Sequence, residues 1–428
     1  MKKRVLIITY DFPPVSGSGV QRPTKFAKYL SEYGWEPVVL TTQKGRVVAR
    51  DPDATLEVQN VEVYRTASPY PYRLQMALKR WFERRSPSFP DFQNPKQLPR
   101  SKWHPKALMV PDAKVFWTPF ALLWATKLSR EKRCDVVLST IPTPSAALLG
   151  FAISRLWGVP HVVDFRDPWF SAYYLPKRIK PLEQFERTLE RKILQHASAA
   201  VVARKDELAE IARFVDEPGF PIELILNGYD EDDYEDVQPK RLGKAFVIAH
   251  VGVMDYPERG FKCLSEALRI LSKARPESVE KLHIVQVGTV SPTLYCEIDE
   301  LRTLVDVTVK PPVPHKEAIC YMLGADLLYL PTFDNIIPGK TFEYLRVRKP
   351  ILCVGDRADN VRSILEDTKS GQVFRKSDYD GIAQYITCVM AGLHEEPLPM
   401  SYIENYSRKC GVNRLAQLLN KVSMPGRT

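Results

Sequence analysis

Short runs of apolar residues alternate with longer segments of helical period along most of the chain, and this alternation limits the fold more than any other feature. In the first half the runs lie at 4–9, 37–41, 135–139, 161–164 and 199–203, and helices are expected near 20–33, 117–132, 143–157 and 181–197. Strands that are apolar throughout are typical of parallel sheets with helices on both faces. The first half is therefore predicted to form one doubly wound α/β sheet.

The second half repeats this pattern after an interruption. The acidic stretch 227–236 (NGYDEDDYED) contains no apolar run, and new runs follow at 245–251, 282–287, 326–330, 350–354 and 371–374. We predict two Rossmann-like, doubly wound parallel-sheet domains at 1–226 and 245–400, with a linker at 227–244 and a helical segment at 401–428. Two such sheets in tandem are expected to face a central cleft, with ligands bound by the loops that follow the strands.

Basic residues are concentrated in the first 200 residues, which hold 32 Lys and Arg against 17 Asp and Glu, whereas the remainder holds 29 against 34. A basic surface attracts anionic lipid, phosphorylated substrates or nucleic acid. No recognised nucleic-acid motif accompanies the charge, so no nucleic-acid partner is expected. No apolar run is long enough to cross a membrane or to act as a cleaved signal peptide, which predicts a cytoplasmic protein.

The seven cysteines are scattered and form no C-x-x-C pair. Neither a disulfide framework nor a metal site is therefore expected.

The most basic segment, 73–106, holds nine Lys and Arg against two acidic residues. Leu74, Leu78, Trp81 and Phe82 share one face of a predicted helix within it. A basic amphipathic helix with aromatic residues can lie on an anionic membrane surface. The apolar face can equally pack on its own domain, and the sequence leaves both alternatives open.

Two loops of the first domain follow predicted strands and could carry chemistry. In the first loop, Gly17, Ser18 and Gly19 precede a helix whose N-terminus could bind an anion. The loop is not a dinucleotide fingerprint, because Arg22 stands where the third glycine is needed. The alternative is a tight turn without a ligand.

The second loop, 164–169 (DFRDPW), places two carboxylates, a guanidinium and an indole at the end of one strand. Arg166 and Asp167 are the candidate site residues in this loop. The alternative is an ion pair between Arg166 and Asp164 or Asp167 that only braces the loop.

In the second domain, Arg259 and Lys262 flank the start of the helix after the run at 245–251. Two cations beside free backbone N–H groups could neutralise a diphosphate without a metal ion. The alternative is a pair of solvated basic residues at a helix start.

The stretch 335–345 (NIIPGKTFEYL) ends like a phosphate-binding P-loop, but Asp334 stands where that loop needs glycine. Pro338 and Gly339 are instead predicted to open a helix, so that N–H groups near Gly339, Lys340 and Thr341 can hold phosphate oxygens. Glu343, one turn further, could accept two hydrogen bonds from a ribose diol. Compensation of the helix dipole is the alternative role for this carboxylate.

Taken in order, these motifs resemble the GT-B glycosyltransferases of the family 4 type, which build bacterial surface polysaccharides and glycolipids. The resemblance covers nearly the whole chain and includes 17–19, 164–169, 227–230, 251–260 and 339–345 before Lys349–Pro350. It implies transfer of a sugar from a nucleotide-diphosphate sugar, a UDP-sugar being favoured, with retention of configuration and without a bound metal or cofactor. It also implies that the helix at 402–422 crosses back to the first domain.

The resemblance assigns roles to single residues. Glu343 matches the second glutamate of the family's E-x7-E pair, but the first position is Asn335, which shifts recognition of the donor sugar to Asn335 and Asp334. Val253 replaces an arginine found in many members, which leaves Arg259, with Lys262 or Lys340, to neutralise the diphosphate. Asp167, beside Arg166, is expected to contact the transferred sugar.

A glycan or lipid-linked acceptor at the inner face of the cytoplasmic membrane would account for the basic first half and for the segment 73–106. Two alternatives remain. One is a nucleotide-sugar epimerase of the same fold. The other is a non-catalytic nucleotide-sugar-binding protein, which Asn335 and Val253 favour.

Overall fold

The computed structural model describes residues 2–15, 17–43, 52–69, 108–131, 134–167, 169, 178–215, 219–241, 243, 245–254, 260–333 and 335–424. The basic segment 73–106 lies outside these residues, and so do Arg259 and Asp334. The chain divides into two compact units, one of Met1–Leu226 with Val412–Thr428 and one of Asn227–Gly411. Each unit is built on its own parallel sheet.

The first unit contains a seven-stranded sheet in the order β3-β2-β1-β4-β5-β6-β7, in which all pairs of strands are parallel. Its strands are β1 (Lys3–Ile8), β2 (Trp35–Thr42), β3 (Glu62–Thr66), β4 (Val136–Ile141), β5 (His161–Phe165), β6 (Ala199–Val202) and β7 (Ile222–Leu224). Its helices are α1 (Ser18–Tyr29), α2 (Pro52–Glu57), α4 (Thr118–Glu131), α5 (Pro144–Trp157), α6 (Lys180–His196) and α7 (Lys205–Ala212).

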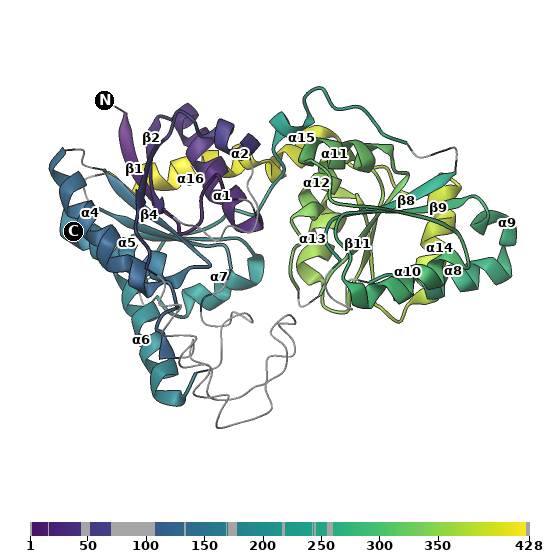
Figure 1. Cartoon of the computed structure of the whole chain (residues 1–428), viewed down its shortest axis with the longest axis horizontal. Helices are drawn as coiled ribbons and strands as arrows, with labels where there is room; N and C mark the ends of the chain where they lie inside the picture. Colours follow the sequence, from purple (N-terminus) through teal and green to yellow (C-terminus); the bar gives the residue numbers. More distant parts are fainter. Residues whose placement is uncertain are drawn as a thin grey trace. The chain divides into compact units, whose positions relative to one another are not determined.

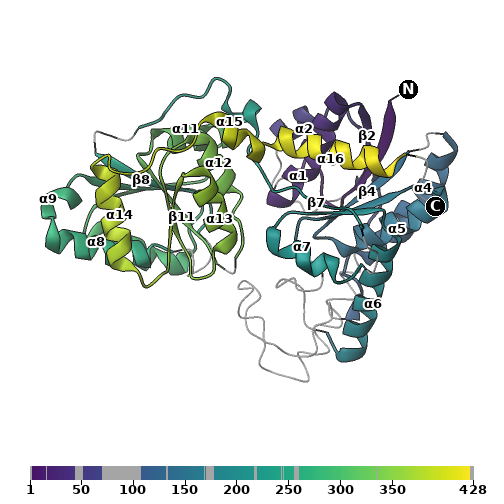
Figure 2. The same cartoon turned by 180° about the vertical axis from the view of Figure 1, so that it is seen from behind.

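Side chains of β1 alternate between two cores, one on each face of this sheet. Val5 and Ile7 pack with α1 and with α16 (Arg408–Val422), whereas Leu6 and Ile8 pack with α4 and α5. Both views show α16 on one face and α4 and α5 on the other (Figures 1 and 2). Burial on both faces explains why the strands are apolar throughout. The predicted return of the C-terminal helix to the first unit is confirmed.

The second unit contains a six-stranded parallel sheet in the order β10-β9-β8-β11-β12-β13. Its strands are β8 (Phe246–Val251), β9 (Leu282–Val287), β10 (Asp306–Lys310), β11 (Leu327–Pro331), β12 (Ile351–Val354) and β13 (Gly371–Phe374). Its helices are α8 (Lys262–Ala274), α9 (Pro276–Val279), α10 (Tyr295–Arg302), α11 (His315–Gly324), α12 (Lys340–Val347), α13 (Asp359–Thr368), α14 (Tyr379–Met390) and α15 (Met400–Ile403). The predicted pair of doubly wound sheets is confirmed.

The strand order reverses between β1 and β4 in the first sheet and between β8 and β11 in the second. Ligands of doubly wound sheets bind outside the carboxyl ends of strands at such a reversal. The loops after these four strands are therefore the places to look for a site. Within the described residues, no helix is both long and apolar enough to cross a bilayer.

Candidate functional site

The first unit has a cavity of about 380 Å³ at the carboxyl ends of β1, β4 and β5. Three of the predicted site residues, Gly19, Arg166 and Asp167, line it together. A Cβ atom added to Gly19 would lie 2.9 Å from Nη1 of Arg166, so glycine lets the guanidinium lie against the start of α1. Gly17 is the N-cap of α1, and Ser18 is its first residue.

Arg166 and Asp167 form an ion pair in this cavity. Nη2 of Arg166 donates to Oδ2 of Asp167 over 3.0 Å. The arginine side chain is 11% exposed, whereas the aspartate is 41% exposed and so remains accessible to a ligand. The pair presents a carboxylate and a guanidinium to hydroxyl groups in the cavity.

Asp164, in contrast, lies outside the cavity in a fully buried ion pair with Arg22. Nη2 of Arg22 donates to Oδ1 of Asp164 over 2.8 Å, and the hydroxyl of Thr140 donates to Oδ2 over 2.8 Å. Nη1 of Arg22 donates to the carbonyl of Ile225 over 2.8 Å. The alternative that Arg166 pairs with Asp164 is therefore wrong, and Arg22 takes that place.

Sequence reasoning missed Lys114, which also lines the cavity. Its Nζ donates to the hydroxyl of Thr143 over 2.8 Å, and lies 3.8 Å from Oδ2 of Asp11 and 4.2 Å from the centre of the Tyr10 ring. Asp112 holds this segment, because its carboxylate accepts hydrogen bonds from the backbone N–H of Lys114 and of Ser145. No pattern in the sequence links Lys114 to the loops after β1 and β4.

In the second unit, the start of α12 brings together Gly339, Lys340, Thr341 and Glu343. Nζ of Lys340 donates to Oε2 of Glu343 over 2.6 Å. The N–H of Thr341 donates to the carbonyl of Pro338 over 3.0 Å, so this amide is not free as expected. The hydroxyl of Thr341 is buried and has no hydrogen-bond partner among the described residues.

Two further residues of this unit surround Glu343. Nε2 of His315 lies 3.9 Å from Oε1 of Glu343 and 3.3 Å from Oδ2 of Asp233. Partial burial disfavours the imidazolium, but the hydrogen bond with Asp233 and the charge of Glu343 outweigh it and raise the pKa of His315. Each carboxylate oxygen of Glu343 thus faces a basic side chain, Lys340 on one and His315 on the other.

The turn after β8 passes close to the side chain of Lys340. A Cβ atom added to Gly252 would lie 3.9 Å from Cγ of Lys340 and 3.6 Å from Nε2 of His250. Gln286 fixes the turn, because its Nε2 donates to the carbonyl of Gly252 over 3.0 Å. Val253, where the resemblance led us to look for an arginine, is 51% exposed.

The start of α8 differs from expectation. Oε2 of Glu297 accepts hydrogen bonds from the backbone N–H of Phe261 over 2.6 Å and of Lys262 over 3.0 Å. The prediction of free N–H groups is therefore wrong for these two amides. A Cβ atom at Gly260 would lie 2.0 Å from the same oxygen, so only glycine permits this cap. No contact among the described residues joins Lys262 to Lys340 or Glu343.

Asn335 has a structural role in this fold. Its Oδ1 accepts a hydrogen bond from the backbone N–H of Asn360 over 2.9 Å, in the first turn of α13. Nδ2 of Asn360 donates back to the carbonyl of Asn335 over 3.1 Å. Asn335 also adopts a φ of 58°, a conformation that asparagine tolerates better than most residues. The oxygen of this carboxamide is thus already occupied.

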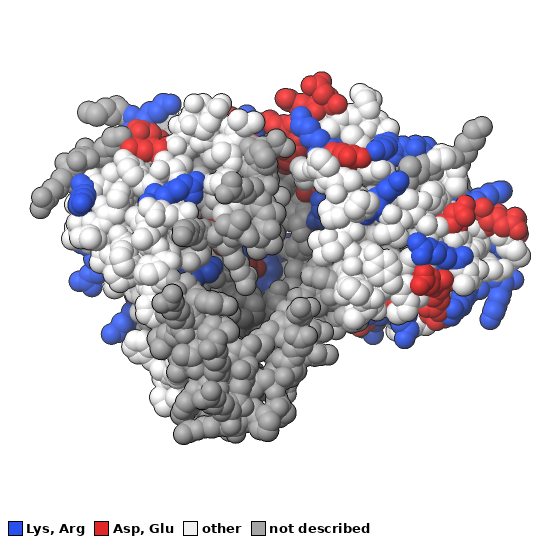
Figure 3. Space-filling view, viewed as in Figure 1, with Lys and Arg blue, Asp and Glu red and all other residues white. Residues whose placement is uncertain are grey.

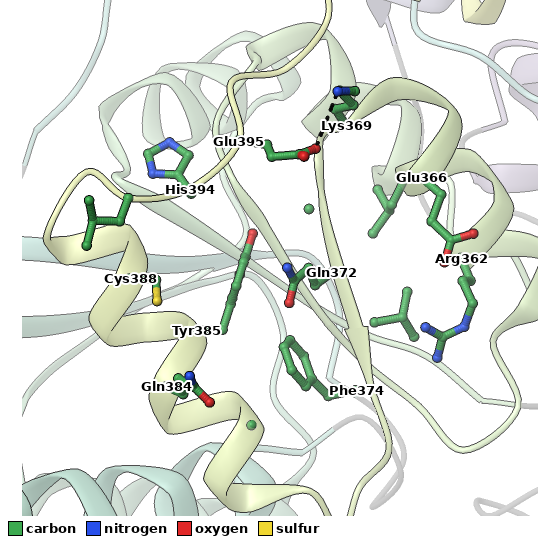
Figure 4. Close-up of a pocket in the computed structure, with 15 residues that line it drawn as sticks. Arg362, Glu366, Lys369, Gln372, Phe374, Gln384, Tyr385, Cys388, His394 and Glu395 are labelled. Atoms are coloured by element: carbon green, nitrogen blue, oxygen red, sulfur yellow. Dashed lines mark ion pairs between the residues drawn. The ribbon is translucent and has the colours of Figure 1, made fainter.

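A larger cavity, of about 710 Å³, lies between α13 and α14 over the edge strand β13 (Figure 4). Arg362 and Glu366 line it from α13, Gln372 and Phe374 from β13, and Gln384, Tyr385 and Cys388 from α14. Lys369 and Glu395 form an ion pair of 3.8 Å at its margin. None of the predicted site residues that the structure describes lines this cavity.

Comparison with known proteins places these features in context. Residues 18–228 match a family model described as a glycosyl transferase 4-like domain. No sequence among curated proteins matches the chain.

Several solved structures are similar to the chain over nearly their whole lengths. They include HepE of Anabaena in complex with UDP-glucose (14% identity, TM-score 0.58, covering 98% of this chain and 99% of HepE). A glycosyltransferase from Rickettsia africae is similar at 13% identity and a TM-score of 0.62, covering 99% and 100% of the two chains. A trehalose 6-phosphate synthase from Burkholderia multivorans is similar at 12% identity and a TM-score of 0.61, covering 100% of both chains.

Proposed function

Because the chain carries a glycosyl transferase 4-like domain and has the fold of the GT-B glycosyltransferases, we propose that it is a retaining glycosyltransferase. It moves a sugar from a nucleotide-diphosphate sugar to a glycan or lipid-linked acceptor. The observation that carries the proposal is the contact of 2.6 Å between Lys340 and Glu343 at the start of α12. This helix follows a strand at the reversal of the second sheet, where doubly wound proteins bind nucleotides.

In the proposed complex, Glu343 accepts hydrogen bonds from the ribose diol, and Lys340 moves to the diphosphate. The N–H groups at the start of α12 add a partial positive charge near the phosphate. HepE binds UDP-glucose, which supports a UDP-sugar as the donor. Lys262 and Arg259 remain candidates for the diphosphate, and no metal ion or cofactor is needed to neutralise it.

The proposed reaction breaks the bond between the anomeric carbon and the β-phosphate oxygen. The acceptor hydroxyl forms its bond on the same face, which retains the configuration, and its proton passes to the departing phosphate oxygen. Lys340, once it has moved to the diphosphate, stabilises the developing charge on that oxygen. Asp167, held by Arg166, contacts hydroxyl groups of the transferred sugar.

The acceptor is assigned to the cavity of the first unit. Carboxylates, threonine hydroxyls and a tyrosine ring line this cavity, a combination suited to a hydroxyl-rich ligand. We assign the acceptor to bacterial surface polysaccharide or glycolipid synthesis at the cytoplasmic face of the membrane. The basic first half of the chain supports this location.

Nucleotide release from UDP-, GDP- and dTDP-sugars tests the proposal. Slow release from one donor is expected, and Glu343→Ala should lower kcat/KM about 10- to 100-fold, as loss of hydrogen bonds to a charged group does. Glu366→Ala is the matched control, because Glu366 lies in the second unit but lines the other cavity. A chain that neither binds nor cleaves any of these donors would contradict the proposal.

The same assay separates the two alternatives. Donor binding without turnover, even when acceptors are added, would support a non-catalytic protein. Release of a rearranged sugar together with the nucleotide would support an epimerase.

A further inference from the structure

Helix α4 carries large apolar side chains on its outer face. Phe116, Phe120 and Leu123 are 39%, 45% and 65% exposed. They are spaced four and three residues apart, and residues at these spacings are neighbours on one helical face. Phe116 belongs to the short 3-10 helix Val115–Trp117, which continues directly into α4. We call these three residues the α4 stripe.

The opposite face of α4 is apolar as well. Trp117, Ala121, Ala125 and Leu128 are buried in the core between this helix and the sheet. A helix at the surface of a globular protein normally has a polar outer face. Single exposed apolar residues need no explanation, but a contiguous group of them marks an interaction surface.

Helix α6 of the same unit shows the usual pattern. Its exposed positions are polar or charged, including Gln184, Arg187, Arg191 and Lys192, with Pro181 and Phe185 as exceptions. The apolar outer face therefore distinguishes α4 from α6, although both helices belong to the same unit.

An exposed basic residue continues the α4 stripe toward the C-terminal end of the helix. Lys127 is exposed and lies four residues after Leu123. The sequence that follows adds Arg130, Lys132 and Arg133 against one acidic residue, Glu131. In Figure 3 the surface around α4 is mostly white, with blue side chains at its edge. Apolar side chains flanked by Lys and Arg are complementary to an anionic bilayer, which offers acyl chains beneath negative headgroups.

The α4 stripe also adjoins the cavity of the first unit. Lys114, which lines that cavity with Asp167, lies two residues before Phe116. Two residues of chain span at most about 7 Å. A surface on which Phe116 rests would therefore lie beside the cavity assigned to the acceptor.

We propose that the α4 stripe docks the first unit on the surface of an anionic membrane. Phe116, Phe120 and Leu123 insert among the lipids, and Lys127 meets the headgroups. A second copy of the chain is a poorer occupant, because a stable protein interface needs about 800 Å² from each partner, far more than three partly exposed side chains offer. The docking itself does not depend on the proposed function. If the proposed function holds, a lipid-borne acceptor reaches the cavity from this surface.

Sedimentation with vesicles tests the proposal on the full chain. The wild type should bind vesicles of 70% phosphatidylcholine and 30% phosphatidylglycerol more tightly than vesicles of phosphatidylcholine alone, and added salt should weaken this binding. The triple variant Phe116→Ser, Phe120→Ser, Leu123→Ser should lose at least tenfold in partition coefficient. The control variant Leu156→Ser, Phe185→Ser changes two exposed apolar residues of the same unit, on α5 and α6, and should bind as the wild type does.

Three outcomes would overturn the proposal. The triple variant binding as well as the wild type would show that the α4 stripe does not touch lipid. Absence of vesicle binding by the wild type would exclude docking. Dimerisation of the wild type that the triple variant abolishes, without any vesicle binding, would identify a second copy as the occupant. Vesicle binding needs no donor, so a failure of the proposed glycosyl transfer would leave this result intact.

Discussion

Asp164 and Arg22 lie 142 residues apart in the sequence, and both side chains are almost fully buried. A carboxylate removed from water is stable only with its partner and its hydrogen bonds in place. The pair thus ties the start of α1 to the end of β5 behind the cavity of the first unit. This role explains why an arginine stands where a dinucleotide-binding loop has glycine.

The first prediction follows from this burial. Arg22→Met should lower the free energy of unfolding by about 3–5 kcal/mol, because the charge of Asp164 loses its partner. Arg187→Met is the matched control, since Arg187 pairs with Glu183 on an exposed face of α6 and should cost less than about 1 kcal/mol. Urea unfolding measures both, and equal losses for the two variants would contradict the prediction.

At this scale the sequence predicted which residues gather near the ends of strands, but not their partners. The loop 164–169 and the stretch 339–343 stood out because they follow strands and are dense in polar groups. The partners Arg22, Glu297 and Asn360 could not be predicted, because ion pairs and helix caps join residues far apart in sequence. Lys114 was missed for the same reason, since only folding brings it to Thr143 and Asp11.

At the scale of the element, α12 depends on the start of α11. His315 lies between Asp233 and Glu343, and its pKa is raised above the ordinary value. Below that raised pKa the imidazolium faces Glu343; above it the positive charge is lost. Both the stability that His315 contributes and its attraction for a diphosphate should therefore decline as the pH rises through its folded-state pKa.

The second prediction concerns this pH dependence. Affinity of the wild type for UDP should fall as the pH rises through the pKa of His315, and His315→Gln should flatten this part of the profile. His394→Gln is the control, because His394 lines the cavity of Figure 4. Calorimetric titration with UDP from pH 6 to 9 provides the measurement. A profile of the same slope in His315→Gln would assign the titration to another group.

Helix α6 supplies the third prediction. Burial, together with the nearby carboxylates of Glu210 and Glu186, raises the pKa of Glu190 to about 8. Above about pH 4.3, the ordinary pKa of a glutamate, Glu190 loses its proton in the unfolded chain but keeps it in the folded chain. The free energy of unfolding therefore falls as the pH rises from about 4.3 to about 8. Glu190→Gln removes this loss and should raise the melting temperature most at pH 8 and above.

Glu183→Gln, on the exposed side of the same helix, should leave the pH dependence of melting unchanged. Thermal unfolding followed from pH 5 to 9 tests the pair of variants. Parallel curves for the wild type and Glu190→Gln would show that Glu190 does not titrate in this range.

Most elements could be predicted, including the edge strand β13, but the other three strands at the sheet margins could not. β3 (EVYRT), β7 (IEL) and β10 (DVTVK) lie at edges of their sheets and mix polar with apolar residues. The periodicity that indicates a parallel strand arises from burial on both faces. A strand with a single neighbour is less buried, so its sequence carries a weaker signal.

At the scale of the whole molecule, the C-terminal helix α16 packs in the core of the first unit and not in that of the second, which precedes it in sequence. Val412, Leu415 and Leu419 of α16 are buried with β1 and α1 of the first unit, although this helix follows the second unit in sequence. The first unit is therefore complete only after α16 has been synthesised. A sequence pattern can predict such a helix but not its core, because the apolar stripe of α16 does not indicate which sheet it covers.

The fourth prediction tests this division of the cores. Leu419→Ala should destabilise the first unit by about 2–5 kcal/mol, as removal of a fully buried leucine side chain does. Ile386 is equally buried in the core of the second unit, so Ile386→Ala is the matched change there. Because each unit has its own core, calorimetry should resolve two transitions, with Leu419→Ala lowering one by roughly 4–20 °C and Ile386→Ala lowering the other. If calorimetry shows only one transition and both variants lower it, the two units unfold together. If two transitions are resolved and both variants lower the same one, α16 belongs to the core of the second unit.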